Sequence, residues 1–131
     1  MRKQYHFRPT DEGVLIWDVD QLVELSAGLT PFDVPLSEIQ ELDEAFWFGA
    51  EGDADAEGDA PTCRRVALHA KLINETDLRH PIILSRDGRV MDGMHRVCRA
   101  LIEGRETIRA VRFRADPAPD YVDIHPDDLP Y

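Results

Sequence analysis

Five consecutive residues, Asp92 to Arg96, bring together a carboxylate, a glycine, an imidazole and a guanidinium in the order Asp-Gly-Met-His-Arg. Apolar residues continue from them at helical spacing, at Met94, Val97, Cys98, Leu101 and Ile102. This pattern predicts a helix that starts beside Gly93 and stops at Gly104. The first turn of a helix carries about four unpaired N–H groups and a partial positive charge, so this turn is a candidate phosphate site.

A cation in the first turn of a helix is disfavoured by about 0.3–1 kcal/mol, and Arg96 occupies such a position. A bound anion would remove this cost, because local rules are broken where function overrides propensity. We therefore expect Gly93 and Met94 to offer backbone N–H groups to a phosphate, and His95 and Arg96 to add side-chain bonds. Arg99, one turn further on, would extend the positive edge.

Asp92 is the candidate catalytic group, together with His95. Next to a phosphate, its carboxylate would bind Mg²⁺ or act as a general base. A second acidic group would then come from Asp33, Glu38 or the stretch 51–59. In the alternative interpretation Asp92 caps the helix and pairs with one of the two following cations, while the other is solvated.

A β-hairpin must position this turn. Residues 82–84 are apolar, Asp87 and Gly88 are turn residues that tolerate positive φ, and residues 90–91 form the returning strand. A helix capped by Thr62 precedes the hairpin and carries His69 as either a hydrogen-bonded core histidine or a ligand-facing one. Residues 107–113 predict a strand buried mainly on one face.

The flanking segments give further expectations. Residues 13–17 predict a strand, followed by a helix ending at Gly28, and we expect this pair to cover an exposed sheet edge. A capping box at Ser37 predicts a helix over 38–45, and the aromatic residues 46–48 after it would be core or would stack on a base. The acidic composition of residues 51–60 predicts a mobile loop. In the acidic tail, an edge strand or a contact with a partner could be formed by Tyr121, Val122 and Ile124.

The stretch from His80 to Val111, with Gly93 and Arg96 as a Gly-x-x-Arg turn, resembles the ParB N-terminal/sulfiredoxin superfamily. In that superfamily a Pro-Ile hairpin leads into a Gly-x-x-Arg helix that ends in a glycine before the next strand. Residues 32–39 are similar to its opening strand and turn, and the helical run 64–78 lies where its members carry the helix before the proline.

The resemblance covers about residues 32–114 and implies an α+β fold, with a small mixed sheet packed with helices. In this interpretation the chain is one domain (1–131): a strand-helix addition (1–31), a core (32–114) with an acidic loop (49–61), and an acidic, proline-rich tail (115–131). Members bind nucleotides at the Gly-x-x-Arg turn, which implies ATP, ADP or CTP here. Met94 stands where sulfiredoxins carry their reactive cysteine, and Met94 and His95 replace a Glu-Arg pair of ParB proteins.

Charge is distributed unevenly along the chain. Residues 61–114 contain twelve Lys/Arg and six Asp/Glu, a balance of +6, whereas the remainder contains three and twenty, a balance of −17, which gives the net −11. A basic middle within an acidic chain favours one small anionic ligand over duplex DNA, which requires many neutralised phosphates. The two cysteines, Cys63 and Cys98, have no metal or disulfide spacing, and no apolar leader is apparent, so we expect a cytoplasmic protein without membrane contact.

Three functions follow from these observations. The first is a nucleotide- or phosphate-binding domain, with or without phosphotransfer or nucleotide hydrolysis. The second is a non-enzymatic interaction or regulatory protein whose acidic surface binds a basic protein partner. The third is a ParB-like nuclease.

Overall fold

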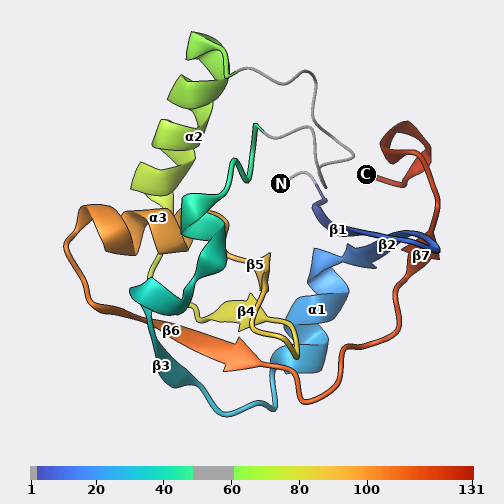
Figure 1. Ribbon diagram of the computed structural model, residues 1–131, viewed down its shortest axis with the longest axis horizontal. Helices are drawn as coiled ribbons and strands as arrows, with labels where there is room; N and C mark the ends of the chain where they lie inside the picture. Colours follow the sequence, from blue (N-terminus) through green and yellow to red (C-terminus); the bar gives the residue numbers. More distant parts are fainter. Residues whose placement is uncertain (1–2, 49–60) are drawn as a thin grey trace.

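The computed structural model describes residues 3–48 and 61–131 and is a small mixed α+β domain with two sheets and three helices (Figure 1). The expected acidic loop falls almost wholly on residues 49–60 and so lies outside the described residues. The strands are β1 (Tyr5–Thr10), β2 (Gly13–Asp18), β3 (Phe32–Pro35), β4 (Ile82–Leu84), β5 (Val90–Asp92), β6 (Thr107–Arg112) and β7 (Tyr121–Val122). The helices are α1 (Val19–Ser26), α2 (Cys63–Glu75) and α3 (Met94–Ile102).

The four-stranded sheet has the order β3-β6-β4-β5 and lies within residues 32–112. β6 runs parallel to β4, while the β3–β6 and β4–β5 pairs are antiparallel, so the sheet is mixed. The β4–β5 hairpin confirms the predicted one, and Gly88 in its turn has a φ of +82°. The α3 helix follows β5 directly, as predicted, and returns the chain to β6 beside β4.

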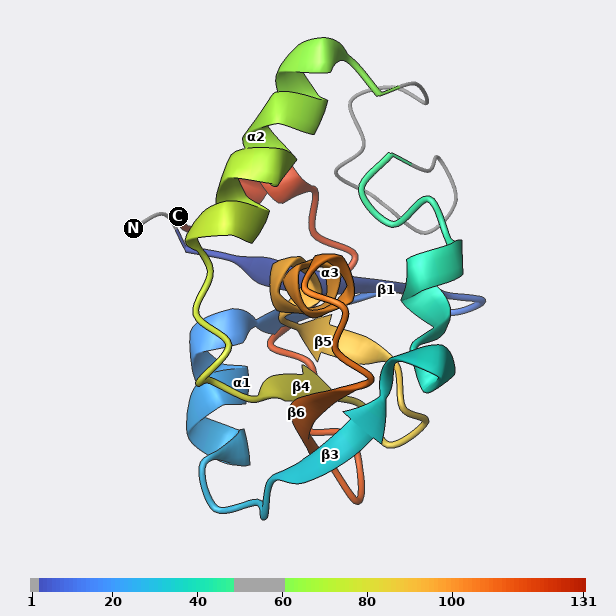
Figure 2. The same ribbon diagram turned by 90° about the vertical axis from the view of Figure 1, so that its left-hand side faces the viewer.

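Both faces of this sheet are covered (Figure 2). One face packs on α3 through Val97 and Ala100, and the other packs on β2 and α1 through Trp17 and Leu22. The N-terminal segment therefore covers a face of the sheet, and the prediction that it covers an edge was wrong. Within β6 the burial is mainly on the α3 side, as predicted, through Ile108 and Ala110, while Thr107 and Arg109 are exposed. Val111, near the end of the strand, joins the second cluster.

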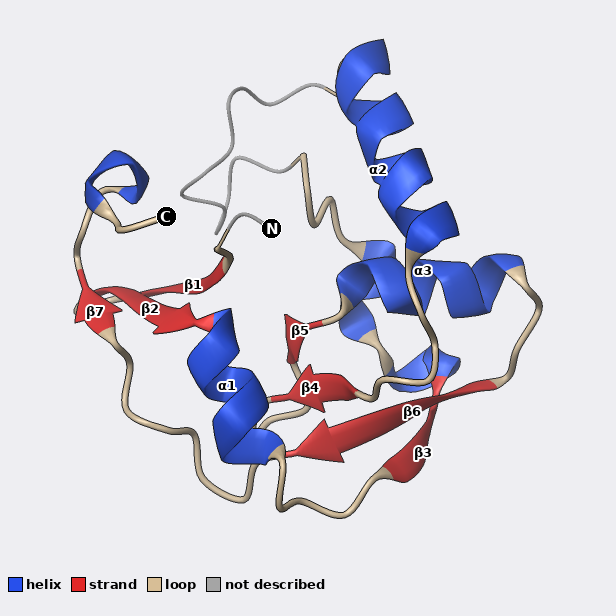
Figure 3. Ribbon diagram, turned by 180° about the vertical axis from the view of Figure 1, so that it is seen from behind, coloured by secondary structure: helices blue, strands red, loops and turns tan. Residues whose placement is uncertain are grey.

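A second sheet, in the order β1-β2-β7, joins the two ends of the described chain (Figure 3). The edge strand predicted in the acidic tail is confirmed, because β7 pairs with β2 through Tyr121 and Val122. Asp116 then fastens the tail to the rest of the protein: it accepts hydrogen bonds from Arg8 Nη1 at 2.9 Å and from the backbone N–H of Arg86 at 2.8 Å. β1, which pairs antiparallel with β2, was not predicted from the sequence.

Two helix predictions need correction. The segment 38–45 forms two short 3₁₀ turns, Leu36–Glu38 and Gln40–Asp43, with Ile39 in an extended conformation between them. Ile39 is only 2% exposed, and its burial in the core, not the capping box, determines the local backbone conformation. In α3 the buried face includes Ala100, whereas Ile102 of the predicted stripe is 74% exposed. The small Ala100 side chain allows α3 to approach the sheet closely.

The α2 helix stands away from the sheets and contacts α3 near its own C-terminal end (Figures 1 and 2). Its predicted N-cap is confirmed, since Thr62 Oγ1 accepts a hydrogen bond from the Arg65 backbone N–H at 3.2 Å. None of its 13 residues is buried. No helix in the described ranges combines the length and apolar character needed to cross a membrane.

Candidate functional site

Gly93 begins the candidate site at the point where β5 becomes α3. It is the N-cap of α3, has a φ of +108°, and within residues 3–48 and 61–131 no side chain caps the helix there. A Cβ atom at this position would lie 2.7 Å from Cγ2 of Ile82, which is fully buried. Glycine is therefore required both by the backbone angle and by the close approach of β4. Among the described side chains, none accepts from the backbone N–H groups of the first α3 turn.

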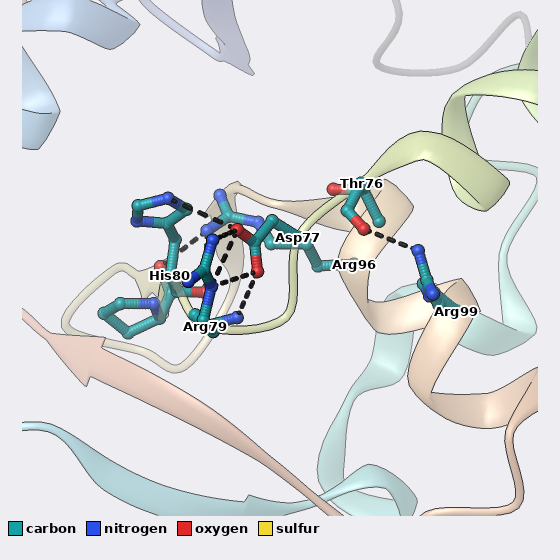
Figure 4. A network of polar contacts seen from close by, with 7 residues as sticks. Thr76, Asp77, Arg79, His80, Arg96 and Arg99 are labelled. Atoms are coloured by element: carbon teal, nitrogen blue, oxygen red, sulfur yellow. Dashed lines mark hydrogen bonds and ion pairs between the residues drawn. The ribbon is translucent and has the colours of Figure 1, made fainter.

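Arg96 does not point away from the protein at this turn. Its Nη1 donates to the carbonyl oxygens of His80 and Pro81, at 2.8 and 3.0 Å, and Figure 4 shows Arg96 reaching His80. Its Nη2 donates to the carboxylate of Asp92 at 2.9 Å. The Arg96 side chain is only 13% exposed. It thus holds the linker between α2 and β4, and the Asp92–Arg96 pair matches the alternative interpretation from the sequence. Asp92 is not the cap, however, because Gly93 occupies that position.

Arg99 acts on the same linker. Its Nη1 donates to the carbonyl oxygen of Thr76 at 2.7 Å (Figure 4) and to that of Asn74 at 2.8 Å. Its Nε pairs with Glu103. Carbonyl groups at the end of a helix have no partner within the helix, so Arg99 satisfies the C-terminus of α2. It borders an open, shallow cleft with Asp77 and other charged residues of both signs. Arg99 therefore anchors α2 and does not lie beside Gly93.

His95 turns from the first turn of α3 towards His69 of α2. The His69 Nδ1 and His95 Nε2 atoms share a hydrogen bond of 2.9 Å. Both imidazole rings lie nearly parallel to the indole of Trp47, with ring centroids 4.2 Å away for His69 and 4.5 Å away for His95. The structure thus brings His69 and the aromatic cluster 46–48, both singled out in the sequence, to the start of α3.

Arg65 completes this group of side chains. It lies one helical turn before His69 on α2, its Nη2 donates to the backbone oxygen of Trp47 at 3.1 Å, and its guanidinium lies 5.4 Å from the ring centroid of Phe48. Its Nη1 is buried and makes no hydrogen bond within the described ranges. Sequence reasoning missed Arg65, although its spacing of four residues from His69 on a helix was a usable signal.

The electrostatics of the pair follow from this neighbourhood. Burial, followed by the charge of His69, lowers the pKa of His95 to about 4. Burial, followed by the charge of Arg65, also lowers the pKa of His69. No carboxylate among residues 3–48 and 61–131 pairs with Arg65, His69 or His95, and none contributes to either shift. Both imidazoles are therefore neutral at pH 7 in the protein as it stands.

The predicted acidic centre is not assembled in the described residues. Asp33 lies on β3 and Asp92 on β5, and these are the two opposite edges of the four-stranded sheet. Glu38 lines a groove with Asp33 and Asp87, not with Asp92. The prediction that Asp33 is a second acidic group near Asp92 is therefore wrong, that for Glu38 stays a prediction, and the stretch 51–59 falls outside the described residues. No group of three or more potential metal ligands occurs in those residues, and Asp92 is already paired, so they do not fit a Mg²⁺ site.

Comparison with known proteins gives no assignment. No protein-family model matches the chain, and no significant match was found among curated proteins or solved structures.

Proposed function

We propose that Arg65, His69, His95 and the N-terminus of α3 bind a phosphate-bearing small molecule, and that the protein is a nucleotide-binding domain of the ParB/sulfiredoxin-like type. The observation that carries the proposal is the composition of this group. Three nitrogen-bearing side chains lie together without a paired carboxylate among the described residues, in a chain of net charge −11. Arg65 is the permanent cation of this group, and its buried Nη1 has no acceptor among the described residues, so an anion is the partner that fits it.

The start of α3 supports the same ligand class. Its first-turn N–H groups are not capped by any side chain that the structure describes, and His95 belongs to the same turn. Backbone N–H groups at a helix N-terminus favour phosphate over neutral ligands because of the helix dipole. In this proposal Gly93 and Met94 contribute backbone donors, as expected from the sequence. The Met94 side chain is 6% exposed and packs in the core.

Arg96 and Asp92 take a different place in this proposal from the one expected. Arg96 can reach a phosphate only if its Nη2 releases Asp92, because its Nη1 is held by two carbonyl groups. Asp92 then competes with the ligand for Arg96 and opposes anion binding. No observation in the structure favours a catalytic role for Asp92 over this competing one.

The test is a thermal-shift series with sulfate, phosphate, ADP, ATP and CTP, each with and without Mg²⁺ and at constant ionic strength. A ligand that binds the folded state raises the midpoint as RT ln(1 + [L]/Kd). We expect the nucleotides to raise it more than chloride does. Arg65→Gln should abolish most of the shift, whereas Arg64→Gln, the same change on the exposed neighbouring residue, should leave it intact.

Two results would contradict the proposal. One is that every anion tested shifts the thermal midpoint no more than chloride does at equal ionic strength. The other is an equal loss in Arg64→Gln and Arg65→Gln, which would indicate a general charge effect instead of a site. His80→Gln provides a further control, because the His80 side chain is 75% exposed and only its backbone oxygen contacts Arg96.

A further inference from the structure

The two histidines at the candidate site form a nearly coplanar pair. Their ring planes differ by 19° and their centroids are 5.2 Å apart. Each ring also lies within 17° of the plane of the Trp47 indole. Rings on opposite faces of the indole would be much further apart, so both imidazoles lie on the same face, edge to edge, with the shared hydrogen bond between them.

This arrangement limits how many protons the pair can hold. In the neutral pair one inner nitrogen donates to the other, and the two outer nitrogens, His69 Nε2 and His95 Nδ1, are one donor and one acceptor. One added proton on the outer acceptor gives an imidazolium that still donates to its partner. A second proton would place two N–H groups against each other at 2.9 Å, together with two like charges, and would break the contact.

The first proton therefore changes what the pair offers to a ligand. Before it is added, the outer nitrogens present one donor and one acceptor; afterwards they present two donors and a full positive charge. An anion accepts hydrogen bonds and gives none, so it fits only the protonated form. Within the described residues, the outer nitrogens have no hydrogen-bond partner of their own.

Among the described groups packed against the pair, none carries a negative charge that would stabilise a protonated imidazole. From α2, Arg65 faces it as a cation; residues 46–48 contribute only aromatic rings. In α3, Arg96 is turned towards the linker, and burial raises the pKa of Cys98, which stays a neutral thiol. A bound phosphate would supply the negative charge that the described neighbours lack.

We propose that the His69–His95 pair is a proton-coupled anion receptor, which takes up one proton as a phosphate-bearing ligand binds and then donates from both outer nitrogens. This inference rests on the phosphate site proposed above. It makes ligand affinity depend on pH with a defined stoichiometry, and it makes mildly acidic conditions favour the bound state. The proton is supplied by water or buffer, so no other reactant is needed.

Sulfate is the right probe, because it stays a dianion over the whole range in which histidine titrates. Binding of sulfate to the full chain is measured by titration calorimetry, in two buffers of different ionisation enthalpy, between about pH 6.5 and about pH 5. We expect uptake of close to one proton per sulfate and an affinity that rises about tenfold per pH unit on acidification. His69→Gln and His95→Gln should each remove this pH dependence, while His80→Gln should retain it.

The outcomes separate the two proposals. Sulfate binding without proton uptake, or a pH dependence that survives in both His69→Gln and His95→Gln, overturns the coupled receptor and leaves the phosphate site standing. No sulfate binding at any pH overturns the coupled receptor, and it overturns the phosphate site as well when no phosphate or nucleotide raises the thermal midpoint above that given by chloride. A measurement without ligand tests the geometry itself: a nuclear magnetic resonance coupling across the hydrogen bond between His69 Nδ1 and His95 Nε2 is expected, and its absence in folded protein contradicts the pair.

Discussion

Replacing Gly93 by alanine should destabilise the protein by about 3 kcal/mol. Two effects add. A residue with a Cβ atom at a φ of +108° costs about 1–2 kcal/mol of backbone strain. The new Cβ would also lie 2.7 Å from Cγ2 of Ile82, which is fully buried and has no space to retreat, and such overpacking costs about 1–3 kcal/mol.

Two other glycines provide matched controls. Gly88 and Gly104 also have positive φ, +82° and +75°, but a Cβ at either position would meet no atom within 4 Å. Alanine there should cost only the strain, about 1 kcal/mol. Urea unfolding of the three variants measures the difference, provided that the m-value stays constant. If Gly93→Ala loses no more stability than the two controls, the close approach of β4 to the start of α3 is not what requires glycine.

Three further predictions concern charged groups. Burial lowers the pKa of both His6 and His95 to about 4, and the next cause is Arg8 for His6 and His69 for His95. Below about pH 6.5 the unfolded chain therefore binds protons that the folded chain does not bind. The free energy of unfolding should therefore fall on acidification, by on the order of 1 kcal/mol per histidine at about pH 5.5. The urea midpoint of His95→Gln should fall less steeply with pH than that of the wild type, and an equally steep fall would contradict the prediction. Glu41 is 2% exposed and accepts a hydrogen bond from the Val90 backbone N–H at 2.6 Å. Glu41→Ala should therefore lower the free energy of unfolding by about 2 kcal/mol, and Glu41→Gln should lower it less. Equal losses of stability for the two variants in urea unfolding would argue against this bond. Asp92→Asn should tighten sulfate binding several-fold in calorimetry by releasing Arg96, whereas weaker binding would restore Asp92 as a ligand-supporting group.

Local signals predicted the part of the fold that local chemistry determines. Gly88 and Gly104 adopt the positive φ that their places in a turn and at a helix end suggested, and Thr62 caps α2 as its side chain predicts. The hairpin, α3 and β6 followed from these signals. The prediction of a short helix near Ile39 was wrong because the burial of Ile39 determines the backbone there, and this burial cannot be read from neighbouring residues in the sequence.

The site was only partly predictable for the same reason. The sequence marked His95 and Arg96 as neighbours, and neighbouring positions on a helix point in different directions, so one reaches α2 and the other the linker. Which carbonyl groups accept hydrogen bonds from Arg96 depends on the path of the linker between α2 and β4, and residue spacing does not predict that path. His69 and Trp47 were each noted, but their stacking is a product of tertiary structure.

The attachment of α2 has a consequence for motion in this protein. Without a buried side chain, this helix is held largely by hydrogen bonds from Arg99 to its last carbonyls and by the contacts of His69 and Arg65. Segments with few buried apolar contacts open at free energies well below that of global unfolding. Amide protons of α2 should consequently exchange with solvent long before those of the central strands. One histidine of the pair therefore lies on a helix without a buried residue, and its partner lies on α3, which packs on the core through Met94, Val97 and Ala100.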